Sequence, residues 1–150
     1  MRFSKIVRNK KQYLPLLLLA DEQEDMIDRY LDRGIMHVLE DPDVKAVCVV
    51  TQEADGLMEI KNLAVAPEHQ RKGCGSAMIR FLCETYPHAA FQVGTGDSPL
   101  TVPFYEACGF VRSHVLKDFF TDNYDHPIIE AGILLRDMVI LKKPAHHRQH

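Results

Sequence analysis

The residues best suited to ligand chemistry lie in a short glycine-rich segment, Gln70 to Gly75, which reads QRKGCG. Its two glycines lack the Cβ atoms that would keep a ligand away from the backbone. The apolar spacing after it predicts a helix, whose N-terminus offers unpaired N–H groups and a partial positive charge. The segment is therefore suited to a phosphate or pyrophosphate, although two such glycines also occur in ordinary tight turns.

Two common nucleotide-binding loops do not fit this segment. A P-loop requires Gly-x-x-x-x-Gly-Lys-Ser/Thr, and a dinucleotide fingerprint requires a third glycine where Met78 stands. The residues from Glu59 to Val65 alternate and predict a strand, and Pro67 indicates a turn. The expected unit is a strand, a turn and a helix, with the candidate phosphate site at the turn.

The other elements follow from periodicity and from turn residues. We expect further strands at residues 1–8, 35–39, 44–51, 89–95, 110–116 and 133–142, and helices at 13–20, at 21–34 and, as a short one, before Gly109. The strands between residues 35 and 66 are expected to form an antiparallel meander. Asp21, with Glu24 three residues later, is predicted to cap the second helix. Residues 117–130 are expected to form a polar and aromatic loop.

The composition indicates one globular domain. Of the 150 residues, 46% are hydrophobic and 26% are charged, which is ordinary for a domain with a packed core. We expect a single domain at residues 1–144 and a flexible tail at 145–150, whose histidines could chelate a metal, although a frayed tail is the simpler explanation. The net charge of -3 gives no electrostatic reason to expect nucleic acid as a partner.

The cysteines and the apolar runs indicate where the protein works. Cys48, Cys74, Cys83 and Cys108 show no Cys-x-x-Cys spacing, so neither a zinc site nor a disulfide framework is expected. The apolar run at 14–20 follows a basic segment, as in a secretory signal, but it is short and ends without a small-x-small cleavage site. No run is long enough to span a bilayer. We therefore expect a cytoplasmic protein with no membrane partner and no bound metal.

Three motifs and the order of elements resemble the GNAT superfamily of N-acetyltransferases. The motifs are LAVAP at 63–67, the Gln-x-x-Gly-x-Gly loop at 70–75, and FYEACGF at 104–110, which is similar to the late Tyr-x-x-x-Gly-Phe element of the family. The resemblance covers nearly the whole chain. It implies an α/β (α+β) fold with a mixed, largely antiparallel central sheet, flanked by helices and splayed near its centre to admit acyl-CoA.

The same resemblance implies acetyl-CoA as the acyl donor, with its pantetheine arm along the strand before the loop. The residues at matching positions for binding this cofactor are Leu63, Ala64, Val65, Gln70, Arg71, Lys72, Gly73, Cys74, Gly75 and Ser76. Many members also carry an asparagine seven residues before the tyrosine of the late motif. Here that position is Ser98, which either donates one hydrogen bond to the cofactor or only caps the following segment.

Direct transfer of an acetyl group to an amine requires a base for the amine and an acid for the departing thiolate. Tyr105 matches the tyrosine that can protonate the thiolate in the family, and packing beside Phe104 is its alternative role. Glu59 matches a glutamate that acts as the base in a subset of members. An ordinary surface glutamate neutralised by Lys61 is the alternative for Glu59.

An acidic and aromatic cluster at 118–125 suggests the kind of acceptor. In the family, the loop between the last two strands and the loop between the first two helices commonly flank the acceptor cleft. The resemblance would bring Asp122, Tyr124 and Asp125 opposite Asp21, Glu22 and Glu24. Carboxylates and aromatic rings there would favour a cation, whereas a solvated loop would show no charge preference.

The expected function is therefore transfer of an acetyl group from acetyl-CoA to a primary amine of a small cationic molecule, a peptide or a protein. A non-catalytic regulatory module that binds acyl-CoA is the alternative, and a nucleotide-binding regulatory domain is a third interpretation that lacks the remaining phosphate and ribose determinants. The sequence is compatible with a homodimer.

Overall fold

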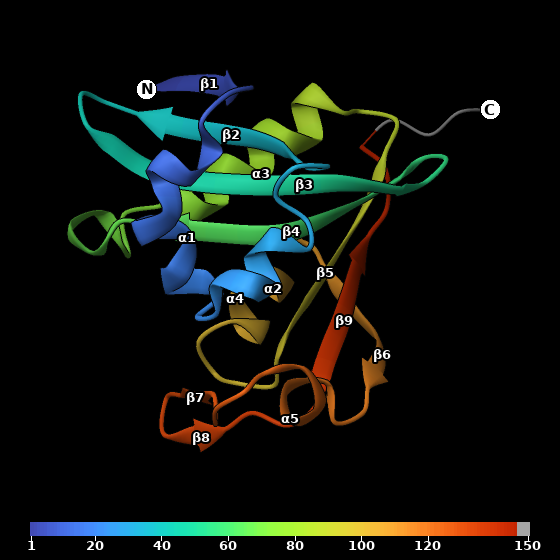
Figure 1. Ribbon diagram of the computed structural model, residues 1–150. Helices are drawn as coiled ribbons and strands as arrows, with labels where there is room; N and C mark the ends of the chain where they lie inside the picture. Colours follow the sequence, from blue (N-terminus) through green and yellow to red (C-terminus); the bar gives the residue numbers. More distant parts are fainter. Residues whose placement is uncertain (147–150) are drawn as a thin grey trace.

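The computed structural model describes residues 1–146, and most of the expected histidine-containing tail, residues 147–150, lies outside them. Its centre is a seven-stranded sheet with the strand order β1-β2-β3-β4-β5-β9-β6 (Figure 1). The strands are β1 (Arg2–Ile6), β2 (Ile35–Glu40), β3 (Val44–Ala54), β4 (Leu57–Val65), β5 (Ala90–Gly96), β6 (Val111–Leu116) and β9 (Met138–Lys143). Only β4 and β5 pair in parallel. The expected mixed, largely antiparallel sheet is confirmed.

Helices cover both faces of this sheet. They are η1 (Lys10–Tyr13), α1 (Leu14–Ala20), α2 (Glu24–Asp28), η2 (Pro67–His69), α3 (Cys74–Thr85), α4 (Val102–Ala107) and α5 (Phe119–Asn123). Leu17 of α1 and Ile27 of α2 are buried against β2 and β3 on one face, and Met78 and Leu82 of α3 are buried on the other (Figure 1). The periodic apolar positions of the sequence therefore form two separate cores.

A bulge in β4 divides this strand between the two cores. Val50 pairs with Ile60 and Val49 pairs with Asn62, so Lys61 is an extra residue in β4. An extra residue reverses the alternation of side chains. As a result Ile60 packs in the core of α3, whereas Ala64 packs in the core of α1 and α2.

The sheet opens beyond this bulge. The parallel pairing of β4 with β5 joins Leu57–Ile60 to Ala90–Val93 and ends there, while β5 goes on pairing with β9 as far as Gly96. The two strands therefore diverge over the second half of β4, as Figure 1 shows. The splayed centre expected from the resemblance is confirmed.

The predicted cap at Asp21 is wrong. Helix α2 begins at Glu24, with Gln23 as its N-cap and no side-chain capping bond. Asp21 instead ends α1, where its N–H donates to the carbonyl of Leu17 at 3.0 Å. Its carboxylate accepts hydrogen bonds from the hydroxyl of Tyr30, nine residues along the chain, and from that of Tyr124, 103 residues along, and these replace the local capping bond.

The expected final strand at 133–142 and the expected loop at 117–130 also need correction. Ile133–Leu134 forms β8 of a separate two-stranded sheet with β7 (Ile129–Glu130), and β9 starts only at Met138. Helix α5 lies within the segment read as a loop. These short elements pack around a small buried cluster of Phe120, Ile128 and Leu135. Within residues 1–146 no helix is long and apolar enough to cross a membrane.

Candidate active site

A cavity of about 500 Å³ lies where β4 and β5 diverge. Residues 60–65 of β4 and 93–96 of β5 form two of its sides. The lining also includes residues 19–22, at and just after the end of α1, residues 128–131 around β7, and the side chains of Tyr105 and Tyr124. The predicted pantetheine positions Leu63, Ala64 and Val65 thus face a cavity, on a stretch of β4 that has no strand partner on the β5 side.

The loop between β4 and α3 presents unpaired backbone donors. Gly73 precedes α3 with a φ of 86°, and Arg71 also has a positive φ, of 61°. No hydrogen bond among the described residues uses the N–H groups of residues 71–73, and the N–H of Ala77 is the first to bond back, to the carbonyl of Gly73 at 2.9 Å. The Gln70 amide holds the loop to β4 by donating to the carbonyl of Val65 at 3.1 Å. The geometry suits an anion such as a pyrophosphate.

The two glycines of this loop have different roles. A Cβ at Gly73 would meet no atom within 4 Å, so the left-handed backbone is what favours glycine there. A Cβ at Gly75 would lie 3.0 Å from Cζ of Phe104. Gly75 therefore allows α4 to pack on the start of α3, which the sequence alone did not show.

Tyr105, the expected proton donor, lies on the wall of the cavity. It is only 7% exposed, yet it lines the cavity, and its ring packs edge-on against Phe104 and Phe110. Its hydroxyl makes no hydrogen bond to any described residue. Burial raises the pKa of Tyr105 well above its usual value. The hydroxyl therefore keeps its proton and is available to a ligand, and its role as acid stays a prediction.

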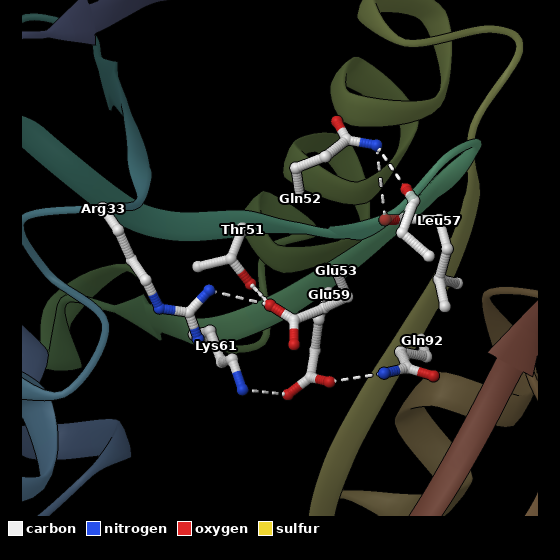
Figure 2. Close-up of polar contacts among 9 residues, drawn as sticks. Arg33, Thr51, Gln52, Glu53, Leu57, Glu59, Lys61 and Gln92 are labelled. Atoms are coloured by element: carbon white, nitrogen blue, oxygen red, sulfur yellow. Dashed lines mark hydrogen bonds and ion pairs between the residues drawn. The ribbon is translucent and has the colours of Figure 1, made fainter.

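Glu59 is held by two neighbours. One carboxylate oxygen lies 2.6 Å from Nζ of Lys61, and the other accepts from Nε2 of Gln92 at 2.5 Å (Figure 2). Glu59 does not line the cavity. The sequence left Glu59 either as the base or as a surface glutamate neutralised by Lys61. The structure shows the ion pair with Lys61. The role of Glu59 as a base stays a prediction.

Ser98 is buried and turned toward its own segment. Its hydroxyl oxygen accepts from the N–H of Leu100 at 3.2 Å, and it donates to the carboxylate of Glu130. Ser98 does not line the cavity, whereas Glu130 does. A local capping role is thus visible, and a contact of Ser98 with the cofactor stays a prediction.

The two segments expected to flank the acceptor lie side by side. Tyr124 donates to Asp21 at 2.6 Å, and the N–H of Asp125 donates to the side-chain oxygen of Gln23 at 3.0 Å. Asp21, Glu22 and Tyr124 line the cavity, but Asp122 and Asp125 are exposed and do not. Burial raises the pKa of Asp21, against the hydrogen bonds from Tyr124 and Tyr30, which lower it.

Comparison with known proteins decides the family. A family model described as the acetyltransferase (GNAT) domain matches residues 32–112, which is more than half of the chain. The chain belongs to the GNAT acetyltransferase family. An uncharacterized N-acetyltransferase of Bacillus subtilis (strain 168), YvbK, is 37% identical over 131 residues, with 84% of each chain covered.

Solved structures of other GNAT acetyltransferases have the same fold. An IAA acetyltransferase from Bacillus cereus ATCC 14579 is 35% identical, with a TM-score of 0.87 over 95% of this chain and 97% of that one. A GNAT family acetyltransferase from Elizabethkingia anophelis, with acetyl-CoA bound, is 29% identical, with the same TM-score and coverage. The resemblance inferred from the three motifs is therefore confirmed.

Two residues of the cavity lining, Asn62 and Glu130, were not anticipated from the sequence, and neither was Tyr30, which contacts Asn62 but lies outside that lining. Asn62 follows the bulge, and its amide donates to the hydroxyl of Tyr30 at 3.1 Å. Glu130 stood in a segment read as a loop, where no pattern distinguished it. The break of alternation at Lys61 was the one available signal for Asn62.

Among residues 1–146 no group of three or more His, Cys, Asp or Glu side chains could hold a metal ion.

Proposed function

We propose that the protein transfers the acetyl group of acetyl-CoA to a primary amine of a cationic small molecule or peptide. The observation that carries this proposal is the cavity between the diverging halves of β4 and β5, with Tyr105 on its wall. The unpaired N–H groups before α3 lie at the end of the same strand and supply the anion site that a CoA pyrophosphate needs. The acetyl-CoA bound to the Elizabethkingia anophelis relative supports this donor.

The charge of the cavity supports a cationic acceptor. Its lining contains the carboxylates of Asp21, Glu22 and Glu130, and its one lysine, Lys61, is already paired with Glu59. Negative groups in a partly enclosed site attract cations and repel anions. We therefore place the acceptor amine at the end of the cavity that Asp21 and Tyr124 form. The reducing cytoplasm is the proposed location, which suits the four free cysteines.

The test has two steps. Acetyl-CoA should raise the Tm of the purified protein, because a ligand that binds only the folded state stabilises it. An amine library should then be screened with release of the CoA thiol as the readout. We expect diamines, polyamines or basic peptides to react faster than amines with no second charge. Thermal stabilisation without thiol release from any amine would favour the non-catalytic alternative.

A further inference from the structure

One chain of hydrogen bonds runs from β4 to the acceptor side of the cavity. Asn62 donates from Nδ2 to the hydroxyl of Tyr30 at 3.1 Å, and Tyr30 donates to Oδ2 of Asp21 at 2.9 Å. Tyr124, just after α5, donates to Oδ1 of the same carboxylate at 2.6 Å. Three of these four residues, Asn62, Asp21 and Tyr124, line the cavity.

Every donor hydrogen in this chain is already used. The second hydrogen of the Asn62 amide goes to the carbonyl of Leu17 at 3.0 Å, and each tyrosine hydroxyl has only one hydrogen, which Asp21 accepts. What remains free are acceptors: lone pairs on the carboxylate of Asp21, on the tyrosine oxygens and on Oδ1 of Asn62. A ligand that binds here must therefore bring donors, as an ammonium group does and a carboxylate or phosphate does not.

Asn62 supplies an independent sign of a missing donor. The residue is only 3% exposed, and Oδ1 has no hydrogen-bond partner among the described residues. A buried acceptor without a donor is destabilising, so most such atoms in folded proteins have a hydrogen-bond partner. Asn62 and Asp21 both line the cavity, and an ammonium group bound there would bring donors to a lining that offers acceptors.

We propose that Asp21 receives the reacting amine as an ammonium ion and removes its proton. The inference deepens the proposed function and rests on it. One N–H bond of the ammonium breaks and its proton passes to the Asp21 carboxylate. The freed lone pair forms the C–N bond to the acetyl carbon, the C–S bond breaks, and the thiolate takes a proton from Tyr105. The nitrogen loses its second proton as the amide forms, and this proton restores the Tyr105 hydroxyl. Asp21 returns its proton to solvent, so the ammonium and the thioester give an amide, a thiol and one released proton.

The groups around Asp21 keep its carboxylate available for this task. The charged and titratable groups that act on Asp21 or share the cavity lining with it are Tyr30, Tyr124, Arg29, Asp25, Glu22, Lys61, Tyr105 and Glu130. Arg29 and the two tyrosines favour the ionised carboxylate, whereas burial and Asp25 oppose it. None of them forms an ion pair with Asp21 in the described residues. Glu59 differs, because one of its oxygens forms an ion pair with the ammonium group of Lys61 and its side chain does not line the cavity (Figure 2).

The first experiment is the pH dependence of kcat/KM for the amine at saturating acetyl-CoA, in the wild type, Asp21→Asn and Glu59→Gln. Asp21→Asn should lower kcat/KM at neutral pH by about 10²-fold or more, which is the contribution of a positioned base. Its acid limb should move up to the pKa of the free amine, because only amine that has already lost its proton can then react. If the acid limb keeps its wild-type position in Asp21→Asn and moves in Glu59→Gln, Asp21 is not the base.

Two further variants separate this role from a structural one. Tyr124→Phe removes a hydrogen bond that lowers the pKa of Asp21, so the acid limb should move to higher pH. Asp25→Asn removes a carboxylate from the start of α2, outside the cavity, and should change kcat/KM less than about threefold. An acid limb that stays in place in Tyr124→Phe, or an equal loss of rate in Asp25→Asn, would overturn the assignment.

A binding measurement distinguishes failure of this inference from failure of the proposed function. Calorimetry should show that 1,4-diaminobutane binds the CoA-saturated protein and that succinate does not, with a loss of diamine affinity of about tenfold or more in Asp21→Asn. Diamine binding of this kind without turnover would refute catalysis but support the amine site. Turnover with unchanged diamine affinity in Asp21→Asn would refute the amine site but support the proposed function.

Discussion

Substitution of Gly73 by valine tests the phosphate loop most directly. Gly73 has a φ of 86°, and a Cβ there would meet no protein atom within 4 Å. The cost to folding therefore comes from the left-handed backbone, about 1–2 kcal/mol for a residue with a Cβ and more for a branched one. No clash with the rest of the fold adds to it.

The cost to acetyl-CoA binding should be separate from this strain. The valine side chain would occupy open space beside the unpaired N–H groups of residues 71–73, where we propose that the pyrophosphate binds. Loss of one hydrogen bond to a charged group costs about 1.5–3 kcal/mol, which raises the dissociation constant about 10- to 150-fold. We expect this loss in calorimetric titrations of the folded variant with acetyl-CoA.

Gly56→Val is the matched control. Gly56 has a φ of 71°, its Cβ would come no closer than 4.0 Å to the carbonyl of His88, and it lies in the turn between β3 and β4, away from the cavity. Its free energy of unfolding should fall by a similar amount, with unchanged acetyl-CoA affinity. If Gly73→Val binds acetyl-CoA as tightly as the wild type, or if both variants lose affinity equally, the loop is not the pyrophosphate site.

Three other predictions follow from the site and the core. Tyr105→Phe should keep the acetyl-CoA affinity and lower turnover by about 10²-fold, and wild-type turnover would reduce Tyr105 to a packing residue. The Michaelis constant for a cationic acceptor should rise with ionic strength, because salt screens the attraction, and it should be higher still in a variant with Asp122 and Asp125 neutralised. An unchanged Michaelis constant in that variant would leave these two aspartates as solvated surface groups. Burial lowers the pKa of His37, and the charge of Lys5 adds to this effect. The imidazole of His37 therefore stays neutral in the folded state, whereas in the unfolded chain it takes up a proton near pH 6.5. Stability should therefore be complete above pH 6.5 and fall below it, and denaturant titrations should show a weaker fall in His37→Gln.

The features that were predicted correctly depend on neighbouring residues. The glycines of the phosphate loop, the apolar spacing of α3 and the alternation of the meander strands each determine local structure within a few residues. The same holds for the end of the short helix α4 before Gly109, whereas its start at Val102, with Thr101 as N-cap, lies beyond the expected cap at Ser98. Local signals therefore located the side of the cavity where we propose that acetyl-CoA binds.

The features that were missed depend on contacts between distant residues. Helix α5 has five residues and the β7–β8 hairpin has two on each strand, too short for a periodic pattern, and the buried cluster of Phe120, Ile128 and Leu135 stabilises them. Asp21 satisfied a capping pattern locally, but Tyr124, 103 residues away, takes one of its oxygens. The side of the cavity where we propose that the acceptor binds is built from such contacts.

Strand β4 explains why one polar residue reaches the cavity and another does not. Ile60 and Leu63 are three residues apart, where plain alternation would separate apolar positions by two, and the extra residue Lys61 absorbs the difference. By alternation, Glu59 and Asn62 then lie on the same face of the sheet. The pairing of β4 with β5 ends at Ile60. Glu59 lies before that end, directly opposite Gln92, which donates to it, whereas Asn62 lies beyond it, where the strands have separated. The position of the split in the sheet, rather than residue type, therefore decides which polar side chain of β4 an acceptor can meet.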